Sequence, residues 1–334
     1  MELDSFIQRV QISPGYQSNA DARKVADPLL EQMRNLSRLP HAPSAEKREL
    51  HKLLGTLQQK LARVLIPQTA ADLSWEEARE IMGEGKFFGQ ESLDAMVADW
   101  SKTMTFPPLP PREEIEAHAK RGDKLRLRVN KTPDGKPLTM QKMQELLQEK
   151  FSKDEDAGDI LADTSWYENE EFFTKDVPAS CWAFTSGELL PDSTDKNYLQ
   201  QTDLLADYVA KTLFKGKVVP PQYQEALDEF KKQRKEIEKL MDSNWQEEAK
   251  RLESLKLNQL LRHSPSEALY DFLQTYCSTQ ERTLENDWTW TNKRSSDGSL
   301  VSFGPCDSGG AYVDNDLPDY TSGYLGVALS RKFL

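Results

Sequence analysis

The sequence has no long apolar run. No stretch of its 334 residues approaches the roughly eighteen consecutive apolar residues that a membrane-spanning helix needs. The first residues, Met-Glu-Leu-Asp-Ser, also lack the basic segment and apolar core of a secretory signal peptide. We therefore expect a soluble, cytoplasmic protein that does not insert into a membrane.

Cysteine and histidine are scarce. The three cysteines, Cys181, Cys277 and Cys306, are an odd number at wide spacing, which fits neither a disulfide framework nor a zinc site, so we predict free thiols. The four histidines show no ligand spacing. The chain also has no phosphate-binding loop and no Gly-x-Ser-x-Gly motif. We therefore expect no metal ion, no cofactor and no enzymatic activity.

Positive charge is in the minority. Asp and Glu number 55 against 43 Lys and Arg, which gives a formal net charge of −12. A chain of this charge is a poor partner for nucleic acid or for an anionic membrane surface. Charged residues make up 29% of the sequence and the mean hydropathy is −0.70, which is more polar than a compact enzyme usually is. We therefore expect elongated helical parts and no nucleic-acid partner.

The first part of the chain predicts a helical domain. From Leu50 to Leu65, leucines recur at three- and four-residue spacing, which is typical of one apolar helix face. The following segment 106–111, Phe-Pro-Pro-Leu-Pro-Pro, cannot continue a helix or a central strand, because proline fixes φ and has no N–H to donate. We predict a helical domain over 1–104 and a proline-rich linker over 105–111.

Two helix starts carry a capping-box pattern. Ser74 is followed three residues later by Glu77, and Ser264 by Glu267, with Pro265 between them at the first helical position. In this pattern the serine and glutamate side chains each accept a backbone N–H of the first turn. We therefore predict helices that begin just after Ser74 and Ser264.

Residues 112–334 mix helices with short strands. Leu125 and Leu127 alternate with polar residues as a strand requires, and the apolar run 181–184 suits a buried strand. The change from helical to mixed periodicity beyond the prolines predicts a second, α+β domain. We place this domain at 112–334.

The stretch 222–263 is strongly charged and helical in pattern, and we predict an inserted helix or helical hairpin. Its apolar residues keep an approximate seven-residue recurrence: Leu227, Phe230, Ile237, Leu240 and Met241. This row of apolar residues, the seam, has to be buried against something. If another copy of the chain or a partner buries it, 222–263 is a site of self-association or docking. Alternatively, the seam folds back on its own domain.

The C-terminal segment 283–334 holds six of the sixteen glycines. Between them lie short runs rich in Trp, Val and Phe, at 288–290 and 300–303, which are typical of strands joined by tight turns. Residues 310–324 are dominated by Asp, Asn, Tyr, Ser and Thr, a composition typical of binding loops. We predict that the ligand-binding side chains are exposed on one face of this β unit. They are Phe303, Cys306, Tyr312, Asp314, Asn315, Asp316, Asp319, Tyr320, Thr321 and Tyr324.

The order of elements from Trp182 onward carries a family resemblance. A strand at Trp182 is followed by two helices and by a glycine-rich β end that closes with Gly-Val-Ala-Leu-Ser-Arg at 326–331. This order resembles the C-type-lectin fold as used by variable proteins of diversity-generating retroelements. In that family a reverse transcriptase rewrites adenine-containing codons near the 3′ end of the gene, and such codons favour Asn, Asp, Tyr, Ser and Thr.

The resemblance implies a fold and a function. The domain over 112–334 would be C-type-lectin-like, with 222–263 as an insertion and 283–334 as the variable region. In such a fold the strand at Trp182 and the last strand, at Leu329, are neighbours. The implied function is non-enzymatic binding of a protein or glycan ligand through a diversified C-terminal surface.

Two other functions remain open. One is a structural or assembly protein with a lectin-like module and helical oligomerisation segments. The other rests on 180–184, Ser-Cys-Trp-Ala-Phe, which resembles the segment around the nucleophile of papain-like cysteine peptidases. That chemistry needs a histidine base and an oxyanion donor, but Lys175 stands where the family has Gln, and the only downstream histidine is His263. We therefore expect Cys181 to be a buried strand residue.

Overall fold

The computed structural model describes Asp27, Glu31 and residues 73–241 and 243–333. Internal contacts divide the chain into two units, Met1–Asp72 and Leu73–Leu334, and the fold given below is that of the second. The helix predicted from Leu50 to Leu65 lies outside the described residues. The helical domain predicted over 1–104 is therefore described only from residue 73 onward.

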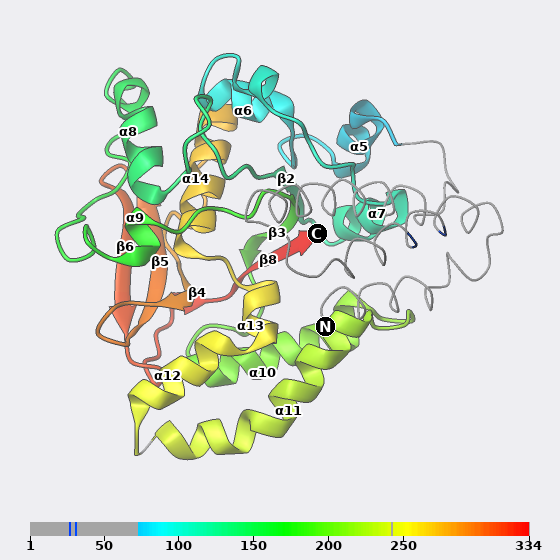
Figure 1. The fold of residues 1–334 in the computed structure, drawn as a ribbon, viewed down its shortest axis with the longest axis vertical. Helices are drawn as coiled ribbons and strands as arrows, with labels where there is room; N and C mark the ends of the chain where they lie inside the picture. The colour runs from blue at the N-terminus through cyan, green and yellow to red at the C-terminus, as the bar shows by residue number, and fades with distance from the viewer. Residues whose placement is uncertain (1–26, 28–30, 32–72, 242, 334) are drawn as a thin grey trace. The chain divides into compact units, whose positions relative to one another are not determined.

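Residues 73–333 form helices and short strands, an α+β arrangement as predicted (Figure 1). The α-helices are α5 (Trp75–Met82), α6 (Gln90–Met96), α7 (Arg112–Lys120), α8 (Met140–Phe151), α9 (Glu171–Thr174), α10 (Tyr198–Tyr208), α11 (Pro221–Met241), α12 (Trp245–Ser254), α13 (Lys256–Leu261) and α14 (Pro265–Thr279). The strands are β1 (Phe87–Phe88), β2 (Lys124–Leu127), β3 (Trp182–Leu189), β4 (Trp288–Arg294), β5 (Leu300–Asp307), β6 (Gly310–Asp316), β7 (Leu325–Gly326) and β8 (Ala328–Phe333). Within the part of the chain that the structure describes, no helix is both long and apolar enough to cross a bilayer.

Both predicted capping boxes are present. At the start of α5, the N–H of Glu77 donates to Oγ of Ser74 at 3.1 Å, and the N–H of Ser74 donates to the Glu77 carboxylate at 2.9 Å. The same reciprocal pair joins Ser264 and Glu267 at the start of α14, with Pro265 in the first turn. These bonds satisfy N–H groups that have no partner inside a helix.

The strands form two four-stranded sheets. The first has the order β1-β2-β3-β8 and the second β6-β5-β4-β7. In the first sheet β3 and β8 are antiparallel, with Trp182 opposite Phe333 and Thr185 opposite Ser330. The strands that hold Trp182 and Leu329 are therefore neighbours, as expected. The second sheet is built from the C-terminal segment, whose predicted strands and turns are confirmed.

Helix α14 lies between the two sheets, beside β2 and β3 on one side and β5 on the other (Figure 1). Every residue from Pro265 to Tyr276 is buried. Its apolar side chains belong to one cluster with Leu125 of the first sheet and Phe303 of the second. The helix is thus the common core element of both sheets.

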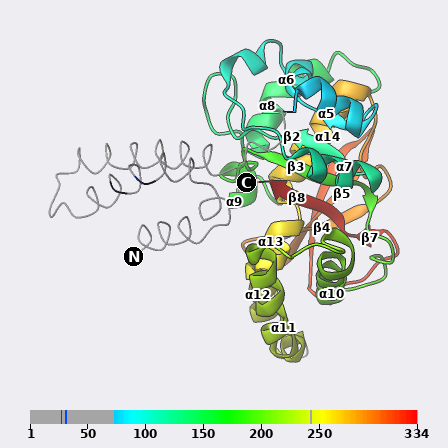
Figure 2. The same cartoon turned by 90° about the vertical axis from the view of Figure 1, so that its right-hand side faces the viewer.

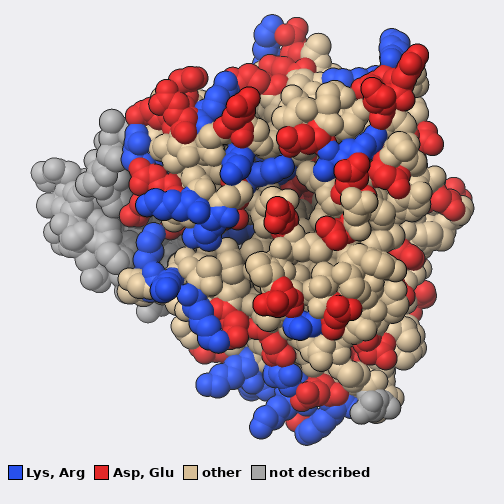
Figure 3. Space-filling model, turned by 180° about the vertical axis from the view of Figure 1, so that it is seen from behind, with Lys and Arg blue, Asp and Glu red and all other residues tan. Residues whose placement is uncertain are grey.

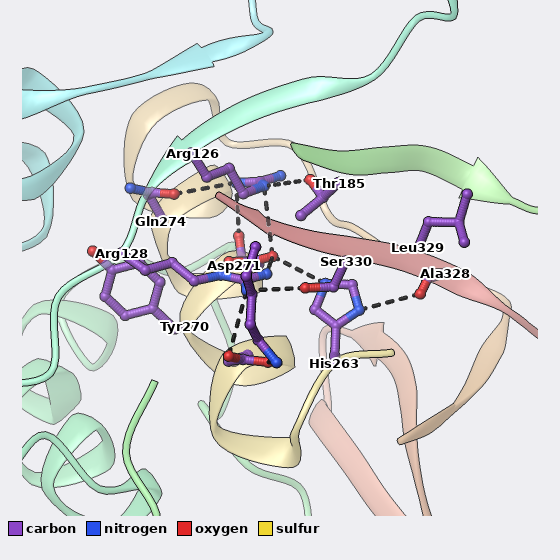
Figure 4. A network of polar contacts seen from close by, with 12 residues as sticks. Arg126, Arg128, Thr185, His263, Tyr270, Asp271, Gln274, Ala328, Leu329 and Ser330 are labelled. Carbon is purple, nitrogen blue, oxygen red and sulfur yellow. Dashed lines mark hydrogen bonds and ion pairs between the residues drawn. The ribbon is translucent and has the colours of Figure 1, made fainter. Parts of the chain in front are cut away.

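A buried polar network fixes α14 against β2 (Figure 4). Arg128 of β2's continuation donates twice to the Asp271 carboxylate of α14, at 2.8 Å and 2.6 Å. Arg126 donates to Oγ1 of Thr185 on β3 at 2.9 Å and lies 3.7 Å from Asp271. Burial alone would raise the pKa of Asp271, but the two arginines outweigh it and hold that pKa well below its usual range.

The same network reaches the last strand. The ring of His263, just before α14, lies between Asp271, 3.1 Å from Nε2, and the carbonyl oxygen of Ala328, 3.2 Å from Nδ1 (Figure 4). Arg128 also donates to Oγ of Ser330 at 2.9 Å. Side chains from the end of β2, from α14 and from β8 therefore belong to one buried polar network.

Helices α10 to α13 form a second cluster. In Figure 2 they lie together below the β3–β8 pair. The predicted insertion 222–263 is helical, since it holds most of α11 together with α12 and α13. Its seam residues Phe230 and Ile237 are buried in a cluster with residues of α10, α12, α13 and β4. The seam therefore folds back on its own domain, and the basis for predicting self-association or docking through 222–263 is removed.

The predicted linker at 105–111 is corrected by the structure. Phe106 and Leu109 pack against the main core cluster, and the indole N–H of Trp182 donates to the carbonyl oxygen of Pro107 at 3.1 Å. Prolines cannot donate hydrogen bonds, but their carbonyl groups still accept them. The segment thus packs over the core and does not separate two domains. The boundary between the two units lies at residue 72 instead.

A second buried cluster joins α7 to β8. Nδ1 of His118 donates to the Asp123 carboxylate at 2.6 Å, and Arg331 donates to Nε2 of the same ring at 2.6 Å. The ring stacks on Phe184, with 3.7 Å between centroids. Because one ring nitrogen donates and the other accepts, the ring is neutral. Burial lowers the pKa of His118 to about 4, although the bond to Asp123 acts in the opposite direction.

This histidine should make stability depend on pH. The ordinary pKa of 6.5 applies in the unfolded chain, so between pH 6.5 and about 4 the unfolded chain binds a proton that the folded chain does not. The free energy of unfolding should therefore fall as the pH falls through this window, by up to about 3 kcal/mol. His118→Gln, whose amide keeps a donor and an acceptor, should lack this contribution. Urea titrations of both proteins from pH 7 to pH 4 measure it, and curves that fall in parallel would contradict it.

Candidate functional site

The outer face of β6 carries three of the predicted site residues. Along a strand, alternate side chains point to opposite faces. Ala311 and Val313 are buried in the main core, whereas Tyr312 and Asp314 are exposed and Asp316 is partly buried. The strand therefore presents a tyrosine and two carboxylates in a row on the face that points away from the main core cluster.

The loop that follows, 317–324, is held to the domain through its backbone. The N–H of Tyr198 donates to the carbonyl oxygen of Pro318 at 3.0 Å, and the N–H of Asp195 donates to that of Ser322 at 2.9 Å. At the end of the loop, the carbonyl oxygen of Tyr324 accepts the N–H of Trp288 at 2.7 Å. The loop backbone is thus fixed, while most of its side chains stay in solvent.

We call these residues the C-terminal surface. It consists of Tyr312, Asp314, Asp316, Leu317, Asp319, Tyr320, Thr321 and Tyr324. Six large apolar side chains are exposed among the described residues, and four of them belong to this surface: Tyr312 (38%), Leu317 (41%), Tyr320 (41%) and Tyr324 (55%). Exposed aromatic side chains concentrated in one place are typical of a recognition surface.

Figure 3 shows the side of the domain on which β4–β6 lie. The right-hand part below the middle is mostly uncharged and is interrupted by Asp and Glu. Lysine and arginine gather instead along the left-hand side and at the lower end, where α11 and α12 lie in Figure 1. The charge on this side of the domain is therefore unevenly distributed.

Two of the predicted site residues are not exposed. Phe303 and Cys306 are fully buried, so their placement at the binding surface is wrong. Phe303 pairs across the sheet with Val313, and both point into the core beside α14. Asn315 also points away from the outer face, and its amide donates to Oγ of Ser295 at 3.1 Å. These three residues position the surface, and none of them contributes a side chain to its exposed part.

Trp288 adjoins the surface but was not among the predicted residues. Its ring lies 6.4 Å from that of Tyr312, centroid to centroid. Gly304 of β5 lies between their strands, and a side chain there would collide with the backbone, since a Cβ would come within 2.2 Å of the carbonyl oxygen of Asp287. The sequence did contain a signal for this contact. A glycine inside a strand often marks a close approach, and Gly304 lies in a strand whose two neighbours carry aromatic residues.

The carboxylates of the surface have no cationic partner within the described residues, where no ion pair involves Asp314, Asp316 or Asp319. Burial raises the pKa of Asp316 to about 6, and the nearby charge of Asp314 adds to this effect. Burial also raises the pKa of the Tyr320 hydroxyl, with further contributions from Asp316, Tyr324 and Asp314. The two carboxylates and the two tyrosines thus lie within electrostatic range of one another.

Two cavities lie elsewhere in the domain. The larger, of about 260 Å³, is bounded by segments 103–107 and 127–131 and by Ser180. The smaller, of about 40 Å³, is bounded in part by Arg126 and Asp271, which are already partners in the buried network. Neither cavity is lined by a residue of the C-terminal surface.

Cys181 is buried, directly before β3. Burial raises the pKa of its thiol to about 11, although Arg128 acts against this shift. His263 has its ring nitrogens directed at Asp271 and at the carbonyl oxygen of Ala328. That histidine is therefore not placed as the base of a cysteine peptidase. In the described residues there is also no group of three His, Cys, Asp or Glu side chains that could hold a metal ion.

No protein-family model, no curated protein and no solved structure matches this chain. The resemblance to a family therefore rests on the order of sequence elements.

The burial of these residues predicts two classes of stability effect. Tyr320→Ala and Tyr324→Ala should each change the free energy of unfolding by about 0.5 kcal/mol, because exposed side chains contribute little to folding. Phe303→Ala should cost about 3 to 5 kcal/mol, because it leaves a cavity in the core. Urea unfolding followed by circular dichroism measures all three. A loss of more than about 2 kcal/mol from Tyr320→Ala would show that its ring supports the fold.

Proposed function

We propose that the protein is a non-enzymatic binding protein that uses the C-terminal surface to hold a macromolecular ligand. The observation that carries this proposal is the concentration of exposed tyrosines on a loop whose backbone is bonded to the domain at Pro318, Ser322 and Tyr324. Tyrosine gives a large contact area with little loss of side-chain entropy, and a fixed backbone lowers that loss further.

The proposal includes a C-type-lectin-like scaffold of the kind used by variable proteins of diversity-generating retroelements. Three features support it: the antiparallel pairing of β3 with the final strand, the separate antiparallel sheet β4–β6, and a surface loop between β6 and β7. The composition of 314–324 agrees with codons that contain adenine. A diversified surface of this kind would bind a protein or a glycan.

The loop and the strand that follows it differ in burial, and this difference also supports the proposal. Val327 is fully buried, and a Cβ on Gly326 would come within 2.6 Å of Oγ of Ser193. Substitutions there would disturb the packing. Tyr320 and Thr321, a few residues earlier, are exposed and free to vary. Side chains that bind can thus change without a change in the strands that hold them.

The assembly alternative is less well supported. It required an uncovered apolar seam on 222–263, and Phe230 and Ile237 of that seam are buried within the domain. A peptidase is likewise disfavoured, because Cys181 has a raised thiol pKa, and the only downstream histidine is directed elsewhere.

Ligand selection tests the binding proposal. A random dodecapeptide phage library and a glycan array would be offered to the 334-residue chain, and the enriched ligands measured against Tyr320→Ala/Tyr324→Ala. We expect affinity to fall at least about tenfold, because exposed aromatic residues commonly carry much of the binding energy. Val218→Ala is the matched control, since Val218 is 91% exposed and lies outside the C-terminal surface. Ligands that bind Tyr320→Ala/Tyr324→Ala as tightly as they bind the control Val218→Ala would show that the C-terminal surface is not the binding site.

The gene tests the retroelement part of the proposal. We expect a nearby near-repeat of the 3′ coding end that differs only at adenines, beside a reverse-transcriptase gene. The differing positions should fall on codons of exposed residues such as Asp314, Asp319 and Tyr320 and spare Gly326 to Arg331. Sequencing of the surrounding DNA decides this, and a locus without such a repeat would remove the retroelement claim.

A further inference from the structure

We propose that the C-terminal surface binds a basic segment of a protein partner, with an arginine or lysine side chain held between the carboxylates of Asp314 and Asp316 and the rings of Tyr320 and Tyr324. This inference rests on the proposed function and adds the chemistry of the ligand. It is carried by the placement of charges and aromatic rings on β6 and the loop that follows.

The two carboxylates lie side by side on an uncharged background. Asp314 and Asp316 are two residues apart on β6 and point to the same face. Their cross-strand partners on β5 are Ser302 and Leu300, which carry no charge. The two carboxylates repel each other, and the charge of Asp314 helps to raise the pKa of Asp316. A ligand cation would remove that repulsion.

The cations of the C-terminal segment are committed elsewhere. The segment 283–334 contains four of them. Lys293 pairs with Asp176 at 2.7 Å, Arg294 with Glu253 at 2.7 Å, Arg331 with Glu114 at 2.6 Å, and Lys332 with Glu267 at 3.1 Å. The negative charge of the surface is therefore left for a partner to neutralise.

The tyrosines suit a cation as well as an apolar contact. An ammonium or guanidinium group is attracted to the face of an aromatic ring, and more strongly where water is excluded. Tyr320 lies close enough to Asp314 and Asp316 for their charges to act on its hydroxyl group. Asp316 is only partly exposed, so an ion pair formed there would be screened less by water than one on the open surface.

The composition of the surface favours a protein segment over a small amine. Leu317 and Trp288 extend the apolar area beyond the carboxylates. Aromatic anchors surrounded by polar groups are typical of protein–protein interfaces. Nucleic acids and anionic glycans would meet like charge here.

The test is a selection with a random dodecapeptide phage library. The library is panned on the wild-type chain, on Asp314→Asn/Asp316→Asn, and on Glu80→Gln/Glu84→Gln. The last variant is the matched control, because it removes the same two charges from exposed glutamates at α5, far from β6 in Figure 1. We expect the peptides enriched on wild type to be more basic than the starting library. Their affinity should fall at least about tenfold for the Asn pair and less than about twofold for the control.

A ligand-side experiment makes the result independent of how the variants fold. Arginine in the best peptide is replaced by citrulline, which keeps the shape and removes the charge. Affinity for the wild-type chain should again fall at least about tenfold, and raised salt should weaken only the arginine form. Citrulline peptides that bind as well as arginine peptides would overturn the inference.

The outcomes separate this inference from the proposed function. Neutral or acidic peptides, or a glycan, that depend on Tyr320 and Tyr324 but not on Asp314 and Asp316 would overturn the inference and leave the binding function standing. Ligands that depend on neither pair would overturn both. Basic peptides that depend on both pairs would support both.

Discussion

The ion pair between Arg128 and Asp271 is the constraint on which the rest of the domain depends. Both groups are buried, and two charges removed from water are tolerated only if their geometry is nearly ideal. The double hydrogen bond between them supplies that geometry. Such a pair adds little net stability over an apolar contact, but its two directed hydrogen bonds disfavour other positions of α14 against β2. His263 and Ser330 then extend the same constraint to the last strand.

From this fixed helix the exposed face of β6 follows by packing. Phe303 and Val313 of the second sheet lie in the core cluster that α14 shares, so one face of β5 and β6 is committed to the core. Because alternate side chains of a strand point to opposite faces, Tyr312 and Asp314 then point outward. Their side chains contribute nothing to the core, and the loop after them is fixed through its backbone. The side chains that hold the fold together and those exposed on the C-terminal surface are therefore different ones.

Local patterns in the sequence predicted much of this fold. The capping boxes at Ser74 and Ser264 and the strands after residue 283 follow from hydrogen-bonding rules that act over a few residues. The pairing of the strand at Trp182 with the last strand was predicted only through a family resemblance. The exposure of most residues of the C-terminal surface was also predicted. Phe303 and Cys306 were misplaced, because the face on which a strand residue lies depends on its register against distant partners, and a shift of one residue reverses it. The seam of 222–263 shows a related limit, since a heptad pattern is the same whether its cover lies in the same chain or in another.

The unneutralised carboxylates can be understood from where each one lies. A charge in open solvent costs little, so the exposed Asp314 and Asp319 are compatible with a stable fold. Asp316 is partly buried beside Asp314, and burial and repulsion raise its pKa to about 6. Stability alone would favour a neutral side chain at this position. Such a carboxylate is instead suited to recognition. Its ionised form is electrostatically unfavourable in the free protein, and a bound cation would offset that cost in the complex.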